Sequence, residues 1–218
     1  IAGVRAPETA TSSATAVASG AGLGRAVLVL AGLATVVGLR WAAIVDGRLG
    51  GIAIGLVFGI ALLGVGLAGR RLAGLPLVVP PSTRAAASDA ALGLAGGLAL
   101  IGIALVTTLA AAGAVRPNGL AADLAGPWLV ATVVVALAED LILRGVLFGM
   151  LERAARWPFA LFVTSAAFAL MHVPVYGWHV VPLDLGVGLF LGGLRLATGG
   201  WLAPGVAHVV ADVATWWL

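Results

Sequence analysis

Apolar residues run through this chain in long blocks, separated by short clusters of glycine, proline and charged residues. A helix needs about 20 predominantly apolar residues to cross the hydrocarbon core of a bilayer. Blocks of about that length predict seven such helices, over residues 26–45, 49–69, 91–114, 127–151, 158–176, 182–198 and 200–218. The pattern therefore predicts an all-α, polytopic membrane protein with about seven transmembrane helices.

The segments outside these blocks divide the chain further. Residues 1–24 are rich in Ala, Ser, Thr and Gly, and no apolar core follows a basic start, so we expect a disordered N-terminal tail rather than a signal peptide. Residues 72–90 contain a Pro-Pro pair and two charges, which is typical of a loop with an interfacial piece. Residues 25–126 then form the N-terminal transmembrane helices, and residues 127–218 form a C-terminal helical core.

The composition agrees with this class. Hydrophobic residues make up 61% of the chain and charged residues only 10%, whereas a soluble domain carries about a quarter charged residues. All 12 basic residues are Arg and they form no basic patch, so we expect the lipid bilayer, and not nucleic acid, as a partner. The chain has no Cys, which excludes disulfides, thiolate catalysis and metal sites built on Cys.

Arginine placement predicts the orientation, because cytoplasmic loops carry an excess of Lys and Arg. With seven membrane-spanning helices, the Arg residues fall on two sides. One side collects Arg5, Arg25, Arg70, Arg71, Arg84, Arg153, Arg156 and Arg195, and the other collects Arg40, Arg48 and Arg116. This favours an integral protein of a bacterial-type cell membrane with its N-terminus in the cytoplasm.

The stretch AEDLILRGVLFGM, residues 138–150, introduces three charges into an apolar block. A charge inside a membrane helix costs from roughly 2.5 to more than 10 kcal/mol, so it usually faces a cavity or an opposite charge. Asp140 and Arg144 are i,i+4 neighbours on one helical face and can pair directly. Glu139 points about 100° away from Asp140 and is therefore the acid left free.

Two further predicted helices carry polar residues at the same spacing. Phe168 and His172 are four residues apart in one helix, and His208 and Asp212 are four apart in another. At about 1.5 Å per residue, Glu139, His172, His208 and Asp212 lie roughly 18, 22, 14 and 20 Å from the cytoplasmic ends of their helices. Three separate helices thus bring acids and imidazoles to one level of the bilayer, as expected for one shared polar site.

Each of these residues also has a structural interpretation. An Asp–Arg pair such as Asp140–Arg144 is more often a structural clamp, and Phe168 is most simply explained by core packing. Asp212 can be a hydrogen-bond partner within its own helix. Glu139, His172 and His208 together at one depth are harder to explain structurally, and they favour a functional role.

The three motifs resemble those of the CPBP family, the CAAX prenyl-protease and bacteriocin-processing intramembrane proteases, also called Abi proteins. The family pattern is Glu-Glu-x-x-x-Arg, Phe-x-x-x-His and His-x-x-x-Asn/Asp in that order, and it is matched within residues 127–218. The second acid here is Asp140 instead of Glu. The resemblance implies a membrane-embedded peptidase that acts on membrane-associated substrates, of CAAX type or bacteriocin type.

The resemblance also implies roles for the site residues. Glu139 would activate water as general base, His172 would help to hold that water, and His208 with Asp212 would stabilise the oxyanion. Asp140, Arg144 and Phe168 would give structural support. Glu139, His172 and His208 are also acceptable ligands for Zn²⁺, but the sequence lacks a His-Glu-x-x-His motif, which favours a glutamate–histidine hydrolase without metal.

Other functions remain open at this stage. A proton-coupled transporter uses the same buried Glu, His, Asp and Arg residues, although the two halves of this chain show no matching pair of Gly/Pro-broken segments. A non-proteolytic membrane partner is the other alternative. The substrate, which we expect to be a peptide or protein at the membrane, is not specified by any residue pattern.

Overall fold

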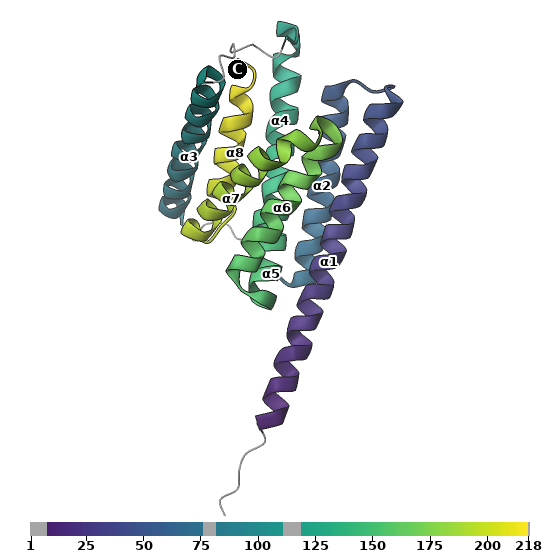
Figure 1. Ribbon diagram of the computed structural model, residues 1–218, viewed down its shortest axis with the longest axis vertical. Coiled ribbons are helices and arrows are strands. Elements are labelled where there is room, and N and C mark those ends of the chain that lie inside the picture. The colour runs from purple at the N-terminus through teal and green to yellow at the C-terminus, as the bar shows by residue number, and fades with distance from the viewer. Residues whose placement is uncertain (1–7, 76–81, 111–118, 218) are drawn as a thin grey trace, which may run out of the picture.

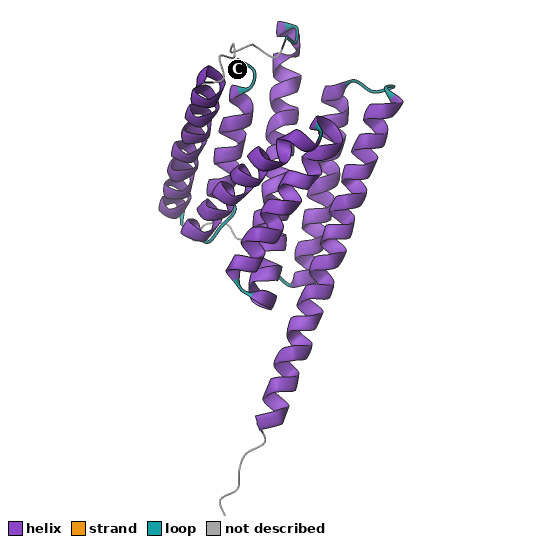
Figure 2. Cartoon of the chain, in the orientation of Figure 1, coloured by secondary structure: helices purple, strands orange, loops and turns teal. Residues whose placement is uncertain are grey.

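A computed structural model of the chain describes residues 8–75, 82–110 and 119–217. Within those ranges the chain is helical and contains no strand (Figure 2). A π-helix, Leu141–Leu147, joins α4 to α5, and short 3-10 turns, Ala122–Leu124 and Trp178–Val180, precede α4 and α7. The helices are α1 (Glu8–Asp46), α2 (Gly51–Ala73), α3 (Thr83–Ala110), α4 (Ala125–Asp140), α5 (Phe148–Ala155), α6 (Trp157–Tyr176), α7 (Val181–Thr198) and α8 (Leu202–Ala214).

The prediction of an all-α membrane protein is confirmed. In the described part of the chain, 5 helical segments are long and apolar enough to cross a membrane: Gly20–Asp46, Gly51–Ala73, Thr83–Val106, Trp157–Tyr176 and Trp178–Thr198. The predicted helix over 127–151 corresponds to α4, the π-helix and α5, which follow one another without a break from Ala125 to Ala155. The last predicted helix corresponds to the shorter apolar helix α8.

Two boundaries differ from the sequence prediction. Helix α3 begins at Thr83, inside the segment 72–90 that was predicted to be a loop, because the Ser82 hydroxyl accepts a hydrogen bond from the Ala85 backbone N–H (3.1 Å). Such a cap satisfies a donor that helix initiation leaves unpaired, and alanine favours the helix that follows. Helix α1 begins at Glu8, within the predicted tail 1–24, of which residues 1–7 lie outside the described residues.

The helices pack side by side as a bundle from which the first part of α1 projects (Figure 1). Helix α1 packs along α2, α2 along α4, α6 along α7, and α3 along α8. Helices α4 and α8 also contact each other directly. The contacts of α4 with α8 and of α6 with the π-helix bring the three helical segments that carry the predicted motifs together.

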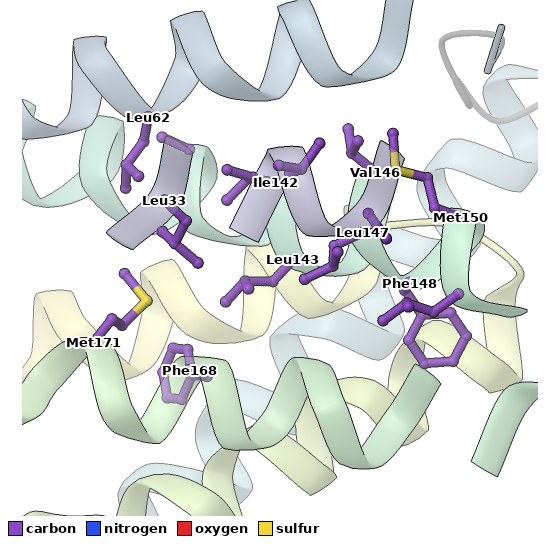
Figure 3. Packing of buried hydrophobic residues seen from close by; sticks show 14 of the residues in the cluster. Leu33, Leu62, Ile142, Leu143, Val146, Leu147, Phe148, Met150, Phe168 and Met171 are labelled. Carbon is purple, nitrogen blue, oxygen red and sulfur yellow. The ribbon is translucent and has the colours of Figure 1, made fainter. Parts of the chain in front are cut away.

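The helical run through the charged stretch lies at the centre of the molecule. Every residue from Ala138 to Leu151 is buried except Gly145, which is half-buried. Leu143 and Leu147 of the π-helix belong to the same buried cluster as Leu33 of α1 and Phe168 of α6, and they lie between those two helices (Figure 3). The run therefore faces protein on all sides, so its charges avoid lipid.

Candidate active site

The adjacent acids Glu139 and Asp140 end α4, and the π-helix begins at the next residue. Asp140 and Arg144 are both fully buried, and Asp140 Oδ1 lies 3.1 Å from Arg144 Nη1. This confirms the pairing predicted from their spacing. Arg144 also donates from Nη2 to the carbonyl oxygen of Gly188 in α7 (3.4 Å), so the buried guanidinium ties the π-helix to a second element. Single π-helical turns inside α-helices are frequent at functional sites.

Asp140 has a second partner that the sequence prediction missed. Its Oδ2 atom lies 2.8 Å from Nδ1 of His208 in α8. A carboxylate paired with Arg accepts hydrogen bonds only, so Nδ1 of His208 is the donor in this contact. The bond fixes the orientation of the imidazole and directs Nε2 away from Asp140. Asp140 is therefore more than a clamp on its own helix, because it holds Arg144 and His208 at once.

Glu139 lies beside the other nitrogen of the same imidazole. Its Oε2 atom is 3.8 Å from His208 Nε2, and Oε1 has no hydrogen-bond partner among the described residues. Asp212 Oδ2 lies 3.4 Å from the same His208 nitrogen. His172 and Arg40 are also close enough to Glu139 to act on its carboxylate electrostatically. Glu139 is thus free of the Arg144 pair, as predicted, and has an unused oxygen.

Phe168 and His172 come from α6. Nδ1 of His172 donates to the Phe168 carbonyl oxygen (2.8 Å), which leaves Nε2 of a neutral ring as an acceptor. The Phe168 ring is buried and contacts both imidazoles edge-on, with centroid distances of 4.8 Å to His172 and 5.4 Å to His208. The guanidinium carbon of Arg144 lies 4.6 Å from the same ring centroid. Phe168 therefore packs against three of the polar residues, which agrees with a supporting role.

Two polar residues near the site were not identified from the sequence. Asp184, in the first turn of α7, has Oδ2 3.6 Å from His172 Nδ1. Arg40 of α1 lies in the wall of a cleft that His172 and His208 also line. Each is a charge inside an apolar block, and that was the available signal. Asp184 lies near the edge of its predicted helix, and Arg40 interrupts a predicted helix outside the three motifs, so neither belongs to the polar stripes of those motifs.

A half-open cleft of about 1240 Å³ gives access to the cluster. Its polar wall includes His172, His208, Asp212 and Asp184, and most of its remaining wall is apolar and comes from α2, α3, α4 and α7. Glu139 does not line the cleft and is only 1% exposed, so the His208 ring lies between its carboxylate and the cleft. The cleft combines a long apolar surface with a small, deep polar end, which suits an extended substrate with one reactive group.

The same imidazoles and carboxylates are of the kind that binds metal ions. Both imidazoles donate from Nδ1 to an oxygen, which is how a zinc-bound histidine is usually oriented. However, the described residues contain no group of three His, Asp or Glu side chains that could hold one ion. Glu139, His172 and His208 as they stand do not form the ligand set that the sequence allowed, and we derive no step through a metal.

Comparison with known proteins agrees with the motifs. Residues 121–214 match the family model described as type II CAAX prenyl endopeptidase Rce1-like. The predicted resemblance is thereby confirmed over the segment that carries all three motifs, and it supports a membrane-embedded peptidase of CAAX-protease type. No curated protein and no solved structure matches the chain.

Proposed function

We propose that this chain, whose residues 121–214 match the type II CAAX prenyl endopeptidases, hydrolyses a peptide bond inside the membrane with a water activated by Glu139. The observation that carries the proposal is the buried chain of contacts Arg144–Asp140–His208–Glu139, which ends at an apolar cleft. In this proposal residues 127–218 are the catalytic core, while residues 25–126 contribute helices to the cleft.

The attacking water would lie between Glu139 and His172. Glu139 has an oxygen without a hydrogen-bond partner among the described residues, and Nε2 of a neutral His172 ring whose Nδ1 donates to Phe168 is an acceptor. Glu139 takes a proton from the water as the water oxygen bonds to the scissile carbonyl carbon. Asp184, 3.6 Å from His172 Nδ1, would help to keep that ring in place.

His208 would stabilise the oxyanion that forms on the carbonyl oxygen. Asp140 accepts from Nδ1–H, so an Nε2–H is present only when the His208 ring is doubly protonated and positively charged. That N–H would point toward the cleft, where Asp212 lies 3.4 Å from the nitrogen. A donor aimed at developing charge in a site shielded from water is a large contribution to catalysis. When the C–N bond breaks, Glu139 returns its proton to the leaving amine, which regenerates the carboxylate.

The substrate that suits this cleft is a membrane-associated peptide. Apolar residues of four helices form most of the cleft, so an apolar or lipid-modified segment can lie against them. A C-a-a-X tail, in which a prenylated Cys precedes apolar residues, has this chemistry. A peptide of bacteriocin type is the alternative substrate.

We infer that the N-terminus faces the cytoplasm of a bacterial-type cell. Arg70 and Arg71 in the last turn of α2 and Arg153 and Arg156 near the α5–α6 junction lie toward one end of the bundle (Figure 1). This asymmetry supports the inference. Because the chain lacks Cys, single Cys residues placed at 48 and 156 test it with a membrane-impermeant thiol reagent on intact cells. We expect the reagent to label position 48 and not position 156. Labelling of position 156 alone would mean that the N-terminus faces the outside.

The proposal is tested by peptide cleavage with purified protein in lipid. Glu139→Gln removes the base but keeps the size of the side chain, so kcat should fall by about 10²- to 10⁴-fold. The matched control is Asp46→Asn, the same loss of an acid at an exposed position, which should leave kcat unchanged. The measurement is release of the C-terminal fragment of a prenylated C-a-a-X peptide and of its non-prenylated form.

The same assay addresses the chemistry and the alternatives. Cleavage should survive exhaustive chelation, and loss of activity that only returned zinc restores would overturn the glutamate–histidine mechanism. An intact Glu139→Gln protein that cleaves at the normal rate would remove Glu139 from the mechanism. If no peptide is cleaved by the unaltered protein, proton uptake into liposomes then tests for a transporter, and its absence leaves a non-proteolytic partner.

A further inference from the structure

Arg40 is a charged residue of the cleft that the proposed chemistry does not use. It comes from α1, outside the segment that carries the motifs, and it lines the same cleft as His172, His208 and Asp212. It is the only Arg among the described residues that line this cleft. It is close enough to act electrostatically on Glu139 and on Tyr176. The cleft therefore has one fixed positive charge near its reactive end.

Arg40 lacks an acidic partner among the described residues. Its Nε atom is buried without a hydrogen bond, and its guanidinium carbon lies 4.3 Å above the Phe58 ring centroid. Arg144 and Arg195, by contrast, each have a carboxylate within 4 Å, that of Asp140 and that of Glu152 respectively. The two acids of the cleft wall, Asp184 and Asp212, are within 4 Å of His172 and His208 instead.

Arg40 is half-buried in the cleft wall with no carboxylate of the described residues within 4 Å, so an anion that reaches it can form a hydrogen-bonded ion pair. Arginine binds a carboxylate through two parallel N–H groups, which adds geometry to the charge. The Phe58 ring holds one face of the guanidinium, which limits its motion and leaves its edge for such a partner. The missing partner is thus a carboxylate that enters the cleft.

We propose that Arg40 binds the free C-terminal carboxylate of the peptide substrate. The inference rests on the proposed function and narrows its substrate class to peptides cleaved close to their C-terminus. A bond within a C-a-a-X tail is at most three residues from the terminal carboxylate, which is about 10 Å in extended chain. Reaction at Glu139 and capture at Arg40 then select one register of the peptide, and an internal sequence without a terminal carboxylate is disfavoured.

Two forms of one prenylated C-a-a-X peptide test the inference, one ending in a free acid and the other in an amide. We expect the unaltered protein to cleave the acid with at least about tenfold higher kcat/KM than the amide, because a hydrogen-bonded ion pair to substrate is lost in the amide. Arg40→Gln should bring this ratio close to one, and Arg40→Lys should keep part of it. Arg48→Gln, an exposed arginine beyond the end of α1, is the matched control and should keep the full ratio.

Binding separates this inference from the proposed chemistry. The labelled acid and amide peptides are titrated onto Glu139→Gln protein, with and without Arg40→Gln. A preference for the acid that depends on Arg40 supports the inference even if no peptide is ever cleaved. Equal binding and equal cleavage of acid and amide by the protein with Arg40 intact would overturn it, and so would a ratio that Arg40→Gln leaves unchanged. The acid-to-amide ratio compares two peptides on the same protein preparation, so a reduced yield of folded variant does not alter the result.

Discussion

Helix α3 and the run from Ala138 to Leu151 are both apolar, yet they lie in opposite surroundings. In α3 only 17% of the most apolar window is buried, whereas all of the run is buried except Gly145. The charges of α3, Arg84 and Asp89, fall in its first two turns, while those of the run lie within it. The apolar pattern of the sequence predicted both to lie in membrane helices, and the internal charges show which one is enclosed by protein, because charges avoid lipid.

The largest effect should come from breaking the buried ion pair. Arg144→Met leaves Asp140 buried with only His208 as partner, so we expect a loss of about 3–5 kcal/mol in the free energy of unfolding. The matched control is Arg48→Met, because the Arg48–Asp46 pair is exposed and such pairs contribute about 0–1 kcal/mol. Unfolding in mixed detergent micelles measures both. Equal losses would mean that burial does not decide the cost of these charges.

A leucine pair compares the two regions without any charge. Leu143→Ala removes a fully buried side chain from the π-helix and should cost about 2–4 kcal/mol. Leu98→Ala is the same substitution in α3, where the side chain is 58% exposed, and its effect should stay within about 0.5 kcal/mol. The same unfolding titration measures both variants. A cost at Leu98 as large as that at Leu143 would show that α3 packs against a surface outside this chain.

A pair of glycines in α3 adds to the comparison, because one face of this exposed helix packs against α8 as closely as core residues pack. A Cβ at Gly97 would lie 2.6 Å from Val210 Cβ and 2.8 Å from the Ala207 carbonyl oxygen of α8. Gly97→Ala should therefore cost about 1–3 kcal/mol and reduce cleavage, since α8 carries His208. Gly102→Ala meets nothing within 4 Å and should be neutral or slightly stabilising. A stable, fully active Gly97→Ala protein would contradict the close contact of α3 with α8.

Local geometry explains why part of the candidate site was predictable. Asp140 and Arg144 lie one helical turn apart in the sequence, and the structure pairs them. The contact persists where the backbone changes from α- to π-helix, since both residues still lie on one face. The separation of Glu139 from this pair follows from the same geometry. The catalytic roles of these residues remain proposals, because position alone does not report chemistry.

Contacts between helices could not be predicted in the same way. The bond between Asp140 and His208 joins residues on α4 and α8, and the contact of Asp184 with His172 joins α7 to α6. Each depends on how two helices rotate about their axes and how closely they approach. Small residues such as Gly97 set that approach, and hydropathy does not report it. The place of Arg40 in the cleft wall could not be predicted for the same reason, because it depends on the packing of α1 against α2.

The sequence by itself determined the helical, membrane-embedded class and the polar residues that each helix carries, because apolar length and the helical repeat act within one segment. It also determined that one acid would pair with Arg144 while Glu139 stayed free. Only the tertiary structure decided that Asp140 also holds His208, that Glu139 lies behind that ring, and that Arg40 shares the cleft. Those arrangements depend on helices packing around a common core, where a side chain's partner is chosen by the shape and charge of neighbours distant in sequence.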